Sequence, residues 1–228
     1  MIPPSIIVKT LIILIAVPFM LYQVRKPSRW IGGRFLRAMN ISHSALTDWG
    51  LAHVPIGQKY TILDVGCGGG RTVAKLAERA PEGNVHGIDY SSESVAVSRR
   101  ENAGAIAAGR VAIEKASVSR LPFPDDHFDL VTAIETQYYW PRPLDDMKEI
   151  RRVLKAGGRA IVILETYRGG RFGAWKGAVM MALRSRHLTL DQHRALFTGA
   201  GFSDVEIFTE PRRGWFCGVG TKPGILTS

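Results

Sequence analysis

The chain has 228 residues and a formal net charge of +10, with 46% hydrophobic and 22% charged residues. This length predicts one sizeable core with a small addition, and the composition is that of an ordinary globular protein. The positive charge favours an anionic partner, so nucleic acid, a membrane surface and an acidic substrate all stay open. The distant cysteines Cys67 and Cys217 and the scattered histidines exclude a disulfide framework and a zinc site, so no metal is expected.

Residues 5–24, SIIVKTLIILIAVPFMLYQV, form an apolar run long enough to cross a hydrocarbon core as a helix. Its one charge, Lys9, lies near the start, whereas Arg25, Lys26, Arg29, Arg34 and Arg37 follow the run. By the positive-inside rule, everything after this segment is cytoplasmic. We therefore expect residues 1–30 to form a single-pass membrane anchor with its basic flank. An interfacial or core helix is the alternative.

Residues 31–57 are interpreted as a linker and a cap on the main domain. Within them, residues 40–56 carry apolar side chains at helical spacing, and Pro55 and Gly57 end the predicted helix. His43 and Trp49 on this helix could close a pocket or could pack in the core.

From Tyr60 onward, predicted strands alternate with helices, which is typical of an open parallel sheet with helices on both faces. The main domain is therefore assigned to residues 58–228. The predicted helices begin and end near Arg71–Ala80, Ser91–Gly109, Leu144–Leu154 and Thr189–Ala200, with Ser91 as an N-cap and Gly157 and Gly158 after the third helix. The predicted strands are 60–65, 85–89, 111–115, 128–134, 159–165, 205–209 and 216–220.

A glycine-rich turn, ILDVGCGGGR at residues 62–71, joins the first predicted strand to the first helix. Gly66, Gly68 and Gly70 would let the bare backbone pass close beneath a ligand, and the helix that follows offers unpaired N–H groups to negative charge. Arg71 stands where a dinucleotide fingerprint requires glycine, and the GK[ST] ending of a P-loop is missing. A plain tight turn is the alternative.

Asp89 ends the second predicted strand, 23 residues after Gly66. There a carboxylate can accept hydrogen bonds from the two vicinal hydroxyls of a ribose. Nicotinamide nucleotides and adenosylated sulfonium cofactors both meet this requirement. The alternative is an N-cap role, which Ser91 already fills.

Four stretches, in this order and spacing, carry a specific resemblance: LDVGCGGG (63–70), GIDYS (87–91), LPFPDDHFDLV (121–131) and EIRRVLKAGGRAIV (149–162). From about Tyr60 to Lys222 the chain strongly resembles class I S-adenosylmethionine-dependent methyltransferases of the Methyltransferase type 11 and ubiquinone/menaquinone C-methyltransferase-like group. The resemblance implies a Rossmann-like α/β fold with seven mostly parallel strands, a C-terminal antiparallel hairpin, and S-adenosyl-L-methionine as cofactor.

The resemblance also assigns roles to individual residues around the cofactor. Asp89 would hold the ribose, Tyr90 would border the adenine, and Ser117 with Val118 would edge the base. Ser117 departs from the family, which often has an acidic residue there, and a hydroxyl accepts more weakly than a carboxylate. The methionine part would be surrounded by Asp64, Gly66, Cys67, Gly68, Gly69 and Gly70, with Cys67 a small turn residue and not a nucleophile.

The acceptor pocket of such enzymes usually begins after the fourth strand, here ETQYYWP at residues 135–141. Glu135 could orient or deprotonate an acceptor, or could be structural. Tyr138, Tyr139 and Trp140 could wall the pocket, although Trp140 could equally pack against the next helix. We predict catalytic roles for Glu135 and Tyr138.

An insertion at residues 166–190 contains five Arg or Lys and no acidic residue. Trp175, Val179, Met180 and Leu183 recur in it at helical spacing, which favours a lid over an apolar substrate or a helix in a lipid interface. A solvated basic helix at the sheet edge is the alternative. An anionic cytoplasmic leaflet would attract its basic groups.

These patterns together predict a membrane-anchored methyltransferase that acts on a small or lipidic acceptor at the cytoplasmic face. A cofactor-binding membrane protein without transfer activity and a nicotinamide-dependent oxidoreductase are the alternatives. Nucleic acid is disfavoured because the chain has no long basic stripe with interleaved aromatic residues.

Overall fold

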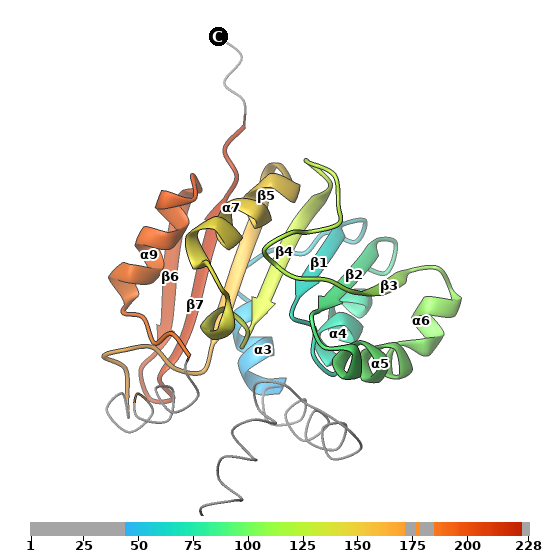
Figure 1. Cartoon of the computed structure of the whole chain (residues 1–228), viewed down its shortest axis with the longest axis horizontal. Coiled ribbons are helices and arrows are strands. Elements are labelled where there is room, and N and C mark those ends of the chain that lie inside the picture. The colour runs from blue at the N-terminus through green and yellow to red at the C-terminus, as the bar shows by residue number, and fades with distance from the viewer. Residues whose placement is uncertain (1–43, 172–176, 178–184, 225–228) are drawn as a thin grey trace, which may run out of the picture.

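The computed structural model describes residues 44–171, 177 and 185–224, and within them a single sheet contains seven strands (Figure 1). Its order is β3-β2-β1-β4-β5-β7-β6, in which β1 to β5 are parallel and β7 is antiparallel to both β5 and β6. The predicted fold class, including the C-terminal hairpin, is confirmed. The strands are β1 (Thr61–Val65), β2 (Asn84–Asp89), β3 (Val111–Lys115), β4 (Phe128–Ile134), β5 (Leu154–Leu164), β6 (Ser203–Glu210) and β7 (Trp215–Thr221).

Helices cover both faces of this sheet, and each face has its own hydrophobic core. The buried residues of α3, α4 and α5 share one core, and those of α7 and α9 share the other. Strand β5 serves both, because Ile161 and Ile163 belong to the first core whereas Ala160, Val162 and Leu164 belong to the second, the alternation expected of a strand buried on two sides. The helices are α3 (Ser44–Leu51), α4 (Arg71–Arg79), α5 (Ser92–Glu101), α6 (Ala103–Ala107), the 3-10 turn η1 (Gln137–Tyr139), α7 (Pro143–Val153) and α9 (Leu190–Gly199).

Helix α3 covers residues 44–51 of the predicted 40–56 helix; residues 52–56 are described and are not helical, so the helix ends earlier than predicted. It lies at the end of the sheet where β4 finishes (Figure 1). A Cβ on Gly50 would stand 2.3 Å from Cδ1 of Ile163, so the missing side chain lets α3 lie directly on β5. On its other side, Lys75 of α4 bonds to Asp48, with 2.5 Å between Nζ and Oδ2. These contacts fix α3 beside the carboxyl ends of the strands.

Two further predicted boundaries are wrong. The single helix expected from Ser91 to Gly109 is divided at Asn102, whose amide donates to the carbonyls of Gly70 and Ser98 at 2.9 Å each. Strand β5 begins at Leu154 and not at Arg159, so Gly157 lies inside the strand with a φ of 76°. The register shift between Phe128 and Leu130 of β4 accommodates the extra residues as an irregularity of the ladder.

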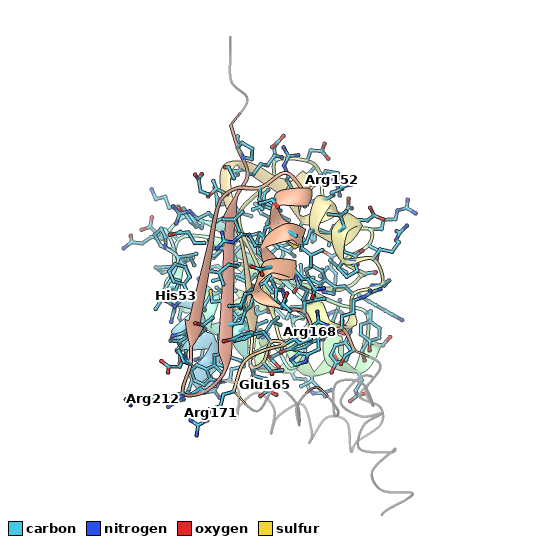
Figure 2. All side chains as sticks on the ribbon, turned by 90° about the vertical axis from the view of Figure 1, so that its left-hand side faces the viewer. His53, Arg152, Glu165, Arg168, Arg171 and Arg212 are labelled. Carbon is cyan, nitrogen blue, oxygen red and sulfur yellow. The ribbon has the colours of Figure 1, made fainter. Side chains whose placement is uncertain are left out.

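The LPFPDD and RRVL motifs form a network of contacts around Arg152, at the end of the sheet away from α3 (Figure 2). The Arg152 guanidinium donates to the carbonyls of Leu121 and Phe123 and forms ion pairs with Asp125 and Glu149. These bonds hold the loop before β4 against α7.

Several predictions fall outside the described residues: the membrane anchor at 1–30, His43, and Trp175, Val179, Met180 and Leu183 of the insertion. Among the residues that are described, no helix combines the length and apolar character needed to cross a membrane.

Candidate cofactor-binding and active site

A cavity of about 390 Å³ opens at the carboxyl ends of β1, β2, β3 and β4, within the size range of small-molecule and cofactor sites. It is lined by the residues that follow each of these strands and by parts of α3 and α4. This is the edge of an open α/β sheet at which ligands bind. The cavity brings together the predicted residues Asp64, Gly66, Cys67, Gly68, Gly69, Asp89, Tyr90, Ser117, Val118 and Glu135, together with Tyr139 and Trp140.

The glycine turn is held in place by β2 and by the end of β4. The N–H groups of Gly66 and Cys67 both donate to the carbonyl of Ile88, at 2.8 and 2.9 Å. Gly66 has a φ of 75°, and a Cβ there would stand 2.5 Å from Oγ1 of Thr136. Gly68 has a φ of 52°, and the nearest atom to an added Cβ would be the carbonyl oxygen of Gly66 at 4.0 Å. Gly66 therefore permits close packing, whereas Gly68 keeps space open beside the cavity.

Gly70, which was also predicted to contact the cofactor, does not line the cavity. An added Cβ would lie 2.4 Å from Oγ of Ser98 and 2.6 Å from Nδ2 of Asn102, both on the neighbouring helical segment. Its φ of 84° also favours glycine. Gly70 thus allows the start of α4 to approach α5.

Asp89 is buried at the end of β2, and each of its carboxylate oxygens accepts one backbone hydrogen bond. Oδ2 accepts from the N–H of Gly68 at 3.0 Å, and Oδ1 accepts from the N–H of Ser91 at 2.8 Å. A carboxylate oxygen can accept more than one hydrogen bond, so both can also receive ribose hydroxyls. Ser91 caps α5 as predicted, its side chain accepting from the N–H of Ser94.

Asp64 lies in the cavity wall at the end of β1 and is 2% exposed. Burial raises the pKa of this carboxyl to about 7, with a smaller raising effect from the charge of Asp89 and an opposing effect from the Thr132 hydroxyl. That hydroxyl donates to Oδ1 of Asp64 at 2.6 Å. A cation placed in the cavity would favour the ionised form.

Cys67 is 6% exposed, and burial raises the pKa of its thiol well above the ordinary value. Its Sγ lies 3.6 Å from Oγ of Ser98. A protonated, buried thiol is a poor nucleophile, in agreement with the predicted role as a small residue of the turn.

Ser117 and Val118 follow β3 and line the cavity, as does Tyr90, which is 48% exposed. The hydroxyl oxygen of Ser117 accepts from the N–H of Ser119 at 3.2 Å. That bond shapes the local turn and occupies part of the acceptor capacity that the adenine contact would use.

Glu135 lines the cavity directly after β4, with a φ of 59° that is uncommon for a residue other than glycine. Its Oε1 accepts a hydrogen bond from the N–H of Glu165 at the end of β5. The carboxylate therefore has a structural contact at the same place where an acceptor would be oriented.

Tyr138 does not line the cavity. It is 5% exposed, and its hydroxyl bonds to the carbonyl and the N–H of Thr166 at 3.1 and 3.2 Å. Burial raises the pKa of this phenol well above the ordinary value. These contacts make Tyr138 a core residue and count against its predicted catalytic role. Trp49 likewise packs with Trp215, at 5.7 Å between ring centroids, which supports the core interpretation of that residue.

The sequence analysis expected the helix that contains α3 to cap the main domain, but it missed the residues by which α3 and α4 line the cavity. Ser44 and Thr47 come from α3, and Arg71, Thr72 and Lys75 come from α4. Positions 71, 72 and 75 directly after the glycine turn share one helical face, a signal that the sequence contained. The position of α3 depends on Gly50 and Ile163, which are distant in the sequence.

Residues 63–162 match the family model described as "Methyltransferase domain". This stretch is a methyltransferase domain. Over 104 residues the chain is 38% identical to the Ubiquinone/menaquinone biosynthesis C-methyltransferase UbiE of Geobacter sulfurreducens, an alignment of 45% of this chain and 40% of that protein. It is 34% identical over 160 residues to the Malonyl-[acyl-carrier protein] O-methyltransferase of the same organism, covering 65% and 58% respectively. The chain thus spans about half the length of these relatives.

Among solved structures, the fold is similar to that of geranyl diphosphate C-methyltransferase from Streptomyces coelicolor, with a TM-score of 0.68 at 16% identity. That alignment covers 78% of this chain and 76% of the other. That structure is also a complex with S-adenosyl-L-homocysteine, and the cofactor expected for this chain, S-adenosyl-L-methionine, is its methylated form.

The cavity fits this cofactor. The Asp89 carboxylate at the end of β2 suits the ribose, the space beside Gly68 admits a ligand that a side chain would displace, and Asp64 offers a buried carboxylate to the ammonium of the methionine part. These acceptors are complementary to the ribose hydroxyls and to the ammonium of the cofactor.

Proposed function

We propose that this protein transfers a methyl group from S-adenosyl-L-methionine to a small or lipidic acceptor at the cytoplasmic face of a membrane. The observation that carries this proposal is that one cavity is lined both by the predicted cofactor residues Asp64, Gly68 and Asp89 and by Glu135 and Trp140. An acceptor bound beside Glu135 and Trp140 would share this cavity with the cofactor.

Methyl transfer from a sulfonium needs little side-chain chemistry, because the donor is already activated. The chain must hold the acceptor in line with the methyl group and exclude water. Tyr139, Trp140 and Pro141 provide a largely apolar wall for that purpose. Glu135 is placed to orient the acceptor or, for a carbon or oxygen acid, to take its proton.

The choice of acceptor class is supported by this wall and by the relatives. Their names describe methylation of quinone precursors, of a malonyl group on a carrier protein and, in the similar structure, of geranyl diphosphate. The membrane location is supported by the apolar residues 5–24 and by the basic residues that follow them.

The nicotinamide-dependent alternative is disfavoured by two features. At one side of the sheet, the antiparallel strand β7 lies between β5 and the edge strand β6. In addition, Arg71 stands where the dinucleotide fingerprint has a glycine. The other alternative, a protein that binds the cofactor without transferring a methyl group, can be distinguished from an active enzyme only by a turnover assay.

The test uses the full chain in detergent or vesicles, S-adenosylmethionine with a labelled methyl group, and a lipid extract of membranes. We expect label in an extractable small molecule, and less label with the Asp89→Ala variant at a donor concentration that does not saturate it. Cofactor binding without any labelled product from lipid or soluble extracts would favour the inactive alternative. Release of the full chain from membranes by alkaline carbonate would contradict the anchor.

A further inference from the structure

One corner of the cavity has no role in the assignments above. It is formed by α3 and α4, and we call it the α3–α4 corner. It carries three hydroxyl groups and two cationic groups, and no carboxylate belongs to its lining. Its residues are Ser44, Thr47, Arg71, Thr72 and Lys75.

The charge of Lys75 in this corner is already used within the protein. Its ammonium donates to the carbonyl and the hydroxyl of Ser44, at 3.2 and 2.9 Å, and forms an ion pair with Asp48. The Lys75 side chain is 16% exposed. These bonds hold α3 on α4, so Lys75 builds the corner and is not the cation available to a ligand.

Arg71 differs from Lys75. In the part of the chain that the structure describes, Nε of Arg71 is buried and has no hydrogen-bond partner. The ion pairs of α4 with described residues are made by Lys75 and Arg79, both with Asp48. A buried cationic N–H without an acceptor is costly, so a donor of this kind in a cavity wall points to an anionic ligand.

The order of the strands indicates which anionic group of a bound cofactor would lie beside Arg71. From β3 to β2 to β1, the cavity passes from Ser117 and Val118, through Asp89, to Asp64 and the glycine turn. A cofactor with its ribose at Asp89 and its base at Val118 extends its methionine part toward β1 and the start of α4. That part carries an ammonium, which suits Asp64, and a carboxylate, which requires a separate donor.

We propose that Arg71 binds the carboxylate of the methionine part of S-adenosylmethionine, with the hydroxyls of the α3–α4 corner around it. The planar guanidinium presents paired N–H donors that match a carboxylate. The proposal rests on the cofactor assignment and extends it: the protein should discriminate against an adenosylated sulfonium or thioether that lacks this carboxylate.

The experiment compares two ligands by calorimetry on the full chain in detergent. One is S-adenosylhomocysteine, and the other is its decarboxylated analogue, S-adenosyl-3-thiopropylamine, which keeps the ammonium. We expect the wild type to bind the analogue at least about tenfold more weakly than S-adenosylhomocysteine, because the analogue cannot form the charge-assisted hydrogen bond to Arg71. Arg71→Gln should lower the affinity for S-adenosylhomocysteine by a similar factor. This variant should therefore bind both ligands about equally.

Arg79→Gln is the matched control, since Arg79 is on the same helix, contacts Asp48 and does not line the cavity. It should keep the wild-type preference, and thermal unfolding should show that every variant is folded. If Arg71→Gln cannot be purified folded, the wild-type comparison of the two ligands decides alone. Equal affinities of the wild type for both ligands would overturn the proposal. An unchanged affinity of Arg71→Gln for S-adenosylhomocysteine would also overturn it, and would assign Arg71 to an acidic acceptor instead. Failure of both ligands to bind the wild type would instead contradict the proposed function.

Discussion

The carboxylate of Asp89 accepts a hydrogen bond from the backbone N–H of Gly68 at 3.0 Å, and this bond joins the end of β2 to the glycine turn after β1. A residue predicted to hold the cofactor thus also holds the turn that shapes the cofactor site. Asp89 should therefore contribute to folded stability as well as to cofactor binding.

Asp89→Ala should weaken cofactor binding by roughly tenfold or more, because the ribose would lose a charged acceptor. It should also lower the free energy of unfolding by about 1 to 3 kcal/mol, because the N–H groups of Gly68 and Ser91 lose their acceptor. Calorimetry with S-adenosylhomocysteine and urea unfolding measure the two effects. A variant that binds as tightly as the wild type would refute the ribose assignment.

Alanine at the two glycines Gly68 and Gly70 should have different consequences. Gly70→Ala would place Cβ 2.4 Å from Oγ of Ser98, so we expect a loss of several kcal/mol in the free energy of unfolding. Gly68→Ala meets no atom closer than 4.0 Å, so its folding cost should be roughly 1 to 2 kcal/mol from the positive φ, and its main effect should be weaker cofactor binding.

Gly109→Ala is the control for this pair, because Gly109 has a φ of 72° and no atom within 4 Å of an added Cβ. Urea unfolding of the three variants separates backbone strain from steric clash. Equal destabilisation by Gly70→Ala and Gly109→Ala would show that the close approach to α5 is unimportant.

Asp64 should make the stability of the ligand-free protein depend on pH. Its pKa in the folded chain is about 7, above the ordinary 3.8, so between these pH values the folded chain retains a proton that the unfolded chain has lost. The contribution of Asp64 to stability therefore decreases as pH rises from about 4 to 7, by on the order of 1.4 kcal/mol for each pKa unit of difference.

Asp64→Asn removes this titration and leaves the Thr132 hydroxyl an amide oxygen to donate to. The variant should gain stability relative to the wild type as pH rises from 5 to 8, measured by urea unfolding at several pH values. The difference cancels pH effects from other groups, including His193, whose pKa burial lowers to about 4. A difference that stays constant with pH would rule out a raised pKa at Asp64.

Substitutions of Glu135 and of Tyr138 should have different effects in a methyl-transfer assay. Glu135→Gln keeps an oxygen that can accept from the N–H of Glu165, so we expect a folded protein with S-adenosylhomocysteine affinity near that of the wild type and a turnover rate lowered by about 10²-fold or more if the carboxylate takes a proton. Tyr138→Phe should leave turnover nearly unchanged and lower stability by about 1 kcal/mol, since its hydroxyl bonds only to the backbone of Thr166 among described residues. The reverse pattern would restore Tyr138 as a catalytic residue.

The sequence was most informative where local signals and burial agree. Strands β3 and β4 have the predicted bounds, because each is an apolar run between turn signals. The helix expected to begin near Thr189 does begin there, at a capping box in which the side chain of Thr189 accepts from the N–H of Gln192. Local pattern was also enough to place Asp64 and Asp89 at strand ends that meet in one cavity.

The remaining features depend on contacts between distant residues. Asn102 divides a helix because its amide reaches the carbonyl of Gly70, 32 residues earlier. Gly70 faces α5 instead of the ligand, and Tyr138 turns toward Thr166 instead of the cavity. The sequence showed which residue types were present, but these orientations follow from how the segments pack.

Calorimetric titration of the full chain with S-adenosylhomocysteine tests the central claim most directly. The proposed function predicts saturable binding of one ligand per chain, weakened in Asp89→Ala and retained in Arg79→Gln. No binding by a protein that circular dichroism shows to be folded would contradict it.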